Sequence, residues 1–136
     1  MPNDRSRAAR WTEFIAERSE FPAGGRLLAA FHAGRITRIC DCGCNAFELE
    51  MPEDTTVDPL SNPGTSGAVF ELSFTAIDDD KPTEQKSLEF ILFVDKRGHF
   101  TGIEVDFCGN SYPVPERVSI QEPPYHVRCS SEIRAA

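Results

Sequence analysis

The chain has 136 residues, 40% hydrophobic and 26% charged, which is the composition of an ordinary globular protein. This length fits one domain and leaves little room for two, so we expect a single α+β domain over residues 1–136, with residues 130–136 frayed. The formal net charge is −8. An acidic surface argues against binding to nucleic acid or an anionic membrane, and it favours solubility or a basic protein partner.

We expect no export signal at the beginning of the chain. Arg5, Arg7 and Arg10 are followed by polar and acidic residues, and the apolar run 27–31 is far too short to cross a bilayer. The five cysteines are an odd number, which does not make a complete set of disulfides. We therefore expect a cytoplasmic protein with reduced thiols.

Two helices are predicted in the first part of the chain. Apolar residues recur at helical spacing over 6–18, where Ser6 is the expected N-cap. A shorter helix is expected over 26–33, and Gly34 stands where a C-terminal glycine belongs. The side chains expected to face the rest of the domain are Trp11, Phe14, Leu27, Leu28 and Phe31.

From residue 35 the spacing of apolar residues changes from helical to alternating, which predicts strands. Helices followed by strands with short connections predict an α+β fold. Its sheet is expected to be an antiparallel meander of four to six strands, with one or two N-terminal helices packed on one face. The expected strands are 35–40, 46–51, 69–77, 87–95 and 99–107, with a short edge strand around 118–120.

The most unusual segment is Cys40-Asp41-Cys42-Gly43-Cys44. In one extended strand its outer cysteines would lie about 13 Å apart, whereas thiolates on one zinc ion lie about 3.8 Å apart. A hairpin that turns at residues 41–43 would bring Cys40 and Cys44 face to face.

Such a hairpin has three interpretations. In the first, Cys40, Cys42 and Cys44 bind zinc. In the second, Cys40 and Cys44 take part in thiol–disulfide exchange. In the third, the segment is a tight turn whose cysteines act as small apolar side chains. We favour the last, because the usual Cys-x₂-Cys pairs are absent and no cofactor is otherwise implied. The soft side chains available as a fourth zinc ligand are Cys108, Cys129, His32, His99 and His126.

Two further segments are candidate partner-binding sites. Asp78, Asp79 and Asp80 form an acidic hairpin tip. Asn110 and Tyr112 precede a proline-rich stretch that favours an extended path, and such a loop is able to present side chains to a partner. The sequence contains no phosphate-binding glycine loop, nucleophile elbow or metal-binding histidine pair, so we assign no catalytic residue.

Two stretches together carry a resemblance to known proteins. The first is the strand that leads into the cysteine segment and begins with Gly34-Arg35-Ile36. The second is a hairpin that contains Leu92-Phe93-Val94-Asp95 and Ile103-Glu104-Val105. It is followed by Gly109 and by Pro113-Val114-Pro115. The chain resembles small bacterial proteins that consist of domains of unknown function, and the hairpin half resembles immunity-type proteins of bacterial competition systems.

Three functions therefore stand as hypotheses. The first is an acidic, immunity-like domain without enzymatic activity that blocks a basic protein. The second is a zinc-binding or thiol-redox domain that uses the three clustered cysteines. The third is a small enzyme with a pocket between its helices and its sheet.

Overall fold

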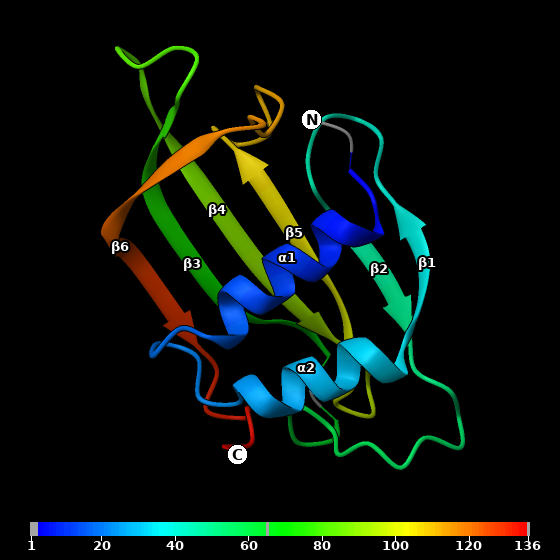
Figure 1. The fold of residues 1–136 in the computed structure, drawn as a ribbon. Helices are drawn as coiled ribbons and strands as arrows, with labels where there is room; N and C mark the ends of the chain where they lie inside the picture. The colour runs from blue at the N-terminus through cyan, green and yellow to red at the C-terminus, as the bar shows by residue number, and fades with distance from the viewer. Residues whose placement is uncertain (1–2, 65, 136) are drawn as a thin grey trace.

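The computed structural model describes residues 3–64 and 66–135. In these residues two helices, α1 (Arg5–Ala16) and α2 (Gly24–Ala33), precede six strands (Figure 1). The strands form one antiparallel sheet in the order β1-β2-β5-β4-β3-β6. They are β1 (Arg35–Ile39), β2 (Phe47–Glu50), β3 (Gly67–Asp78), β4 (Gln85–Val94), β5 (Phe100–Phe107) and β6 (Val118–Cys129).

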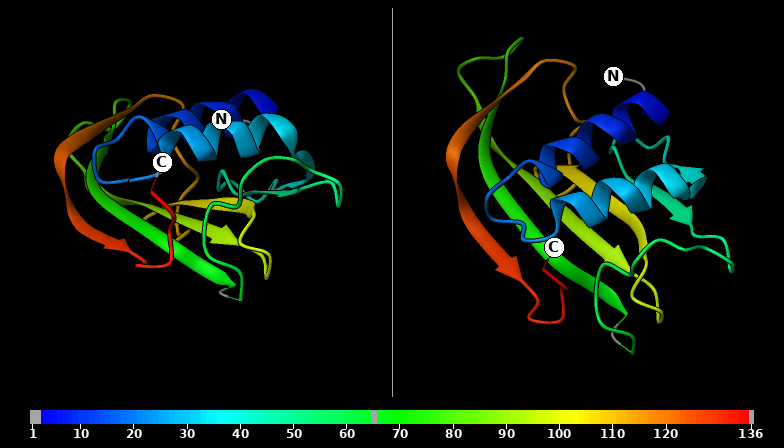
Figure 2. Two further views of the ribbon diagram at one scale, coloured as in Figure 1. Left: turned by 90° about the horizontal axis from the view of Figure 1, so that it is seen from below. Right: turned by 60° about the horizontal axis from the view of Figure 1, so that its bottom comes forward.

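Both helices lie on the same face of the sheet, which curves around them (Figure 2). The core between the two layers is rich in aromatic rings. The ring centres of Trp11 and Phe14 on α1 each lie 5.2 Å from that of Phe90. The ring centre of Phe14 also lies 5.8 Å from that of Phe74. Burial of one large apolar side chain contributes about 1.5–3 kcal/mol. These contacts fix the helices on the sheet, and the predicted α+β fold with N-terminal helices on one face is confirmed.

The sheet is not a simple meander. The β1–β2 and β3–β4–β5 segments are successive hairpins, but β2 pairs with β5, and β6 returns beside β3. The join between β2 and β5 requires a glycine: a Cβ at Gly102 would lie 2.4 Å from the carbonyl oxygen of Phe47. The backbone of Gly102 also has φ +155°, where other residues are strained. Local sequence spacing does not reveal either of these long-range pairings.

Two element boundaries differ from the sequence prediction. The first helix begins after Asp4, whose carboxylate accepts a 2.8 Å hydrogen bond from the Arg7 amide, so Asp4 and not Ser6 is the N-cap. The final strand is much longer than expected from Pro123 and Pro124. It tolerates the prolines because it is an edge strand and because its pairing with β3 is interrupted at residues 122–125.

The end of the chain was expected to be frayed over 130–136, and the structure anchors its described part. Ile133 is 9% exposed and forms a bridge with Ser61, and the Arg134 amide donates a 2.9 Å hydrogen bond to the Leu60 carbonyl. These contacts attach the tail to the loop that precedes β3. Residue 136 lies outside the described residues.

Candidate functional site

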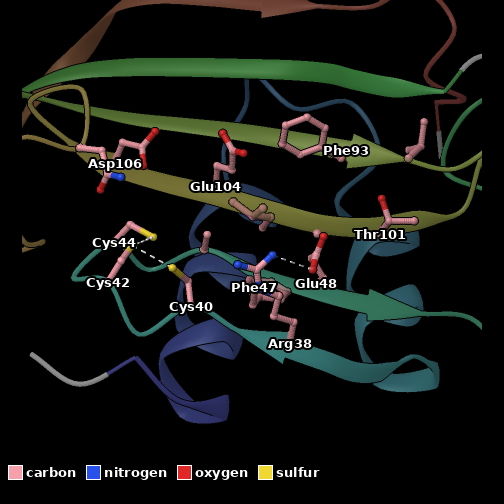
Figure 3. Close-up of a pocket in the computed structure, with 15 residues that line it drawn as sticks. Arg38, Cys40, Cys42, Cys44, Phe47, Glu48, Phe93, Thr101, Glu104 and Asp106 are labelled. Carbon is pink, nitrogen blue, oxygen red and sulfur yellow. Dashed lines mark hydrogen bonds and ion pairs between the residues drawn. The ribbon is translucent and has the colours of Figure 1, made fainter.

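Three cysteines converge in the loop between β1 and β2 (Figure 3). The Sγ atom of Cys42 lies 2.8 Å from that of Cys40 and 3.1 Å from that of Cys44, and all three sulfurs lie within 4.8 Å of one another. The predicted hairpin therefore forms, although it turns over more residues than 41–43. The sequence predicted that Cys40 and Cys44 face each other directly. In the structure the Cys42 sulfur contacts both of them.

Side chains from the N-terminal part of the chain hold the two ends of this loop. The Asn3 side-chain amide donates to the carbonyls of Cys40 at 3.0 Å and Ala46 at 2.7 Å, and the Cys40 amide donates to Ala46 at 3.0 Å. The Trp11 indole donates a 2.9 Å hydrogen bond to the Asn45 side chain, and both groups are buried. The loop is thereby tied to α1.

The opposite side of the loop is held by segments that follow β4. The Asn45 amide donates to the Val105 carbonyl at 3.1 Å, and the Val114 amide donates to the Gly43 carbonyl at 2.9 Å. Gly43 has φ +108°, and a Cβ there would lie 3.2 Å from the Pro113 side chain. Contacts from four parts of the chain therefore hold the backbone of the loop in one arrangement.

The three thiols differ in their exposure to solvent. Cys44 is 5% exposed, Cys40 is half-buried and Cys42 is exposed. Burial raises the pKa of the Cys44 thiol to about 12. The pKa of Cys42 is lowered to about 7, first by the hydrogen bond with the Cys40 thiol and further by hydrogen bonds with Cys44 and the Asn110 side chain. Cys42 is therefore the reactive thiol of the group.

A groove of about 480 Å³ runs from these thiols along the sheet. It lies on the face that the helices leave open (Figure 3). Arg38 and Glu48 form an ion pair of 3.7 Å on one wall. Glu104 and Asp106 lie on the other wall, where burial raises the pKa of both carboxyls. The neighbouring Asp106 raises the pKa of Glu104 further, and Glu89 does the same for Asp106.

The chain matches no family model, no curated protein and no solved structure. Among the described residues, no helix has the length and apolar character that crossing a membrane requires. The site must therefore be interpreted from its own geometry.

The candidate fourth ligands named from the sequence are not at this site. Within the described part of the chain, the group of potential metal ligands contains Cys40, Cys42 and Cys44 alone, without an additional histidine, cysteine or carboxylate. Cys108 and Cys129 remain free thiols elsewhere in the fold. A metal ion bound here would keep one coordination position for a ligand from outside the protein.

The two residues proposed for the proline-rich loop are separated by the fold. Asn110, with φ +66°, lines the groove beside Cys42 and so belongs to the cysteine site. Tyr112 is 46% exposed, and the Lys86 ammonium lies 4.5 Å from the centre of its ring. Tyr112 instead lines a small hollow of about 60 Å³ together with Asp78.

The carboxylates of the acidic hairpin tip find hydrogen-bond donors within the protein itself. Asp80 accepts a 2.5 Å hydrogen bond from the Arg117 guanidinium, and Asp79 accepts one of 2.6 Å from the Ser119 hydroxyl. The Asp78 carboxylate accepts from the Asp80 amide at 2.9 Å. These bonds attach the tip to the beginning of β6, which gives the aspartates a structural role.

Sequence reasoning missed the residues that build the site around the thiols. Asn3 and Asn45 hold the loop, and no local pattern distinguishes them from other asparagines. Glu104 and Asp106 had a usable signal: they alternate with the buried Ile103 and Val105, which places them on the open face. What the sequence lacked was the position of β5 beside the cysteine loop.

Proposed function

We propose that this domain binds a zinc ion through the thiolates of Cys40, Cys42 and Cys44. The observation that carries the proposal is the convergence of three sulfurs within 4.8 Å on a loop whose backbone is fixed from outside. Soft thiolate ligands are those that zinc and copper(I) prefer. A loop held in this way has already lost most of the conformational entropy that metal binding would cost.

The distances suit a single ion. Three thiolates on one zinc lie about 3.8 Å apart, since each Zn–S bond is about 2.3 Å long. The closest sulfurs here are 2.8 and 3.1 Å apart, so these pairs need to separate by about 1 Å or slightly less to take up the ion. The exposed Cys42 is free to make this adjustment, while the buried Cys44 gives the site a fixed point.

Competition with a chromophoric zinc chelator tests the proposal. We expect Cys42→Ser to weaken zinc binding by more than about 100-fold, because a ligand is lost rather than a residue that supports one. Cys129→Ser is the matched control, since Cys129 is an exposed thiol outside the cluster. Equal zinc affinity in the wild type and the Cys42 variant would rule out this site.

A second function, thiol–disulfide exchange, is supported by the 2.8 Å contact between the exposed Cys42 and Cys40. The Cys42 thiolate would attack a low-molecular-weight disulfide, forming a mixed disulfide and releasing one thiolate. The Cys40 thiolate would then attack the Cys42 sulfur and release the second. The two protein thiol protons pass to the two released thiolates, so the protein is oxidised and the small disulfide is reduced.

Mass spectrometry after incubation with oxidised glutathione tests this second function. We expect a loss of two hydrogens that is absent in Cys42→Ser and retained in Cys108→Ser. Bound zinc should slow the reaction, because it occupies the attacking thiolate. A mixed disulfide that never resolves into an internal one would contradict the exchange reaction.

A further inference from the structure

We infer that the groove beside the cysteine loop holds a cationic thiol, whose sulfur completes the coordination of the metal bound by Cys40, Cys42 and Cys44. This inference rests on the proposed metal site and names the class of ligand that this site would take. The ligand has two parts: a thiol at the metal and a positive charge farther along the groove.

The position of the thiols supports the first part. All three cysteines line the groove, and their sulfurs converge at one end of it (Figure 3). The described residues supply only three soft ligands within bonding range of one another, so a tetrahedral ion keeps its fourth position for an external ligand. A sulfur ligand suits an ion that already has three thiolates.

The charges of the groove support the second part. Glu104 and Asp106 lie on the wall formed by β5, and neither forms an ion pair within 4.0 Å among the residues that the structure describes. Arg38, the only basic residue that lines the groove in the described part of the chain, is already paired with Glu48. The groove is therefore negative, as is a zinc ion with three thiolates, and it favours a cation over an anion of the same size.

The dimensions of the groove fit a small ligand or a short piece of a larger one. Its volume of about 480 Å³ lies in the range of small-molecule sites. Phe93 on β4 lies beyond Glu104, opposite Gly102, and provides an apolar surface at the part of the groove farther from the thiols (Figure 3). When the ligand binds, its thiol proton passes to solvent and its sulfur replaces a water molecule on the metal.

Cobalt(II), which substitutes for zinc and absorbs visible light, allows the two steps to be followed separately in the full chain. Thiolate-to-cobalt absorption on adding cobalt alone reports the three-cysteine site. A further increase on adding 2-aminoethanethiol reports the fourth ligand. The anionic 3-mercaptopropionate and the thiol-free ethanolamine are the matched probes for charge and sulfur.

We expect 2-aminoethanethiol to bind about tenfold more tightly than 3-mercaptopropionate, and ethanolamine to leave the spectrum unchanged. Replacing Glu104→Gln and Asp106→Asn together should remove most of this preference while cobalt binding persists. Glu50→Gln is the control, since Glu50 is an exposed carboxylate of β2 outside the groove and should leave the preference intact.

A second set of probes identifies the source of the thiol. Tighter binding of Lys-Cys-Lys than of 2-aminoethanethiol, with no binding of Lys-Ser-Lys, indicates a basic protein segment, whereas equal or weaker binding indicates a small aminothiol. Failure of cobalt to bind would refute the metal site itself. Cobalt binding without any charge preference among thiols would refute the cationic ligand and leave the metal site standing.

Discussion

The cysteine loop and the acidic hairpin tip are both turns between neighbouring antiparallel strands, yet their side chains are used in opposite ways. In the cysteine loop, Asn3 and Asn45 hold the backbone and the thiols are left to face one another. At the tip, Asp79 itself accepts a hydrogen bond from Ser119 in β6, and Asp80 accepts one from Arg117 just before that strand. Reactive side chains are available for a ligand where other residues carry the structural contacts.

Among substitutions that leave the three cysteines in place, the largest effect is expected from removing the anchor of the cysteine loop. Asn45→Ala deletes a buried hydrogen bond and leaves the Trp11 indole unpaired, which should lower the free energy of unfolding by about 1–3 kcal/mol. Zinc affinity should fall about tenfold, as it does when residues that support metal ligands are lost. Chemical denaturation and chelator competition measure the two effects.

Asn62→Ala is the matched control for this variant. The Asn62 side chain donates to Glu132 at 3.0 Å on the surface, so its loss should change stability by less than about 0.5 kcal/mol. An Asn45 variant with unchanged zinc affinity would show that anchoring of the backbone does not prepare the site.

The next effect is the pH dependence of zinc binding. Cys44, with its pKa raised to about 12, must release a proton when it becomes a zinc ligand, so affinity should rise with pH by at least about tenfold per unit. Cys42, with its pKa lowered to about 7, releases one further proton on binding zinc only below that pH. The slope of log affinity against pH should therefore decrease by about one as the pH rises through about 7.

Chelator competition across that pH range measures the slope, with the chelator's own protonation subtracted. In Cys42→Ser the change of slope near neutral pH should vanish. A constant slope in the wild type would mean that Cys42 keeps its proton up to higher pH and does not differ from the other thiols as inferred.

The smallest effect is expected at the acidic tip. Arg117→Ala removes an exposed pair with Asp80, whose two side chains are 70% and 60% exposed, and solvent screening leaves such pairs with little effect on stability. The loss should shrink further in high salt, and zinc affinity should not change. A thermal unfolding series in salt checks this. A change in zinc affinity would mean that the two turns are coupled, and it would contradict the separate roles assigned to them.

Much of the fold followed from local patterns. Alternation of Ile103 and Val105 with Glu104 identifies β5 and its buried face, and the spacing of Trp11 and Phe14 identifies the face of α1 that packs on the sheet. Two predictions failed for different reasons. At α1 the error was local, because the Asp4 carboxylate and not the Ser6 hydroxyl caps the helix. At β6 the cause was tertiary, because the strand tolerates prolines at the edge of the sheet.

The sequence by itself determined which faces of the helices and strands turn toward the core and that a hairpin at Cys40–Cys44 would bring thiols together, because both depend on spacings of a few residues. Only the tertiary structure decided that β2 lies beside β5, which places Glu104, Asp106 and Asn110 around those thiols. Strand order depends on the packing of the whole core, for example on the close approach that Gly102 permits. No local pattern contains that information.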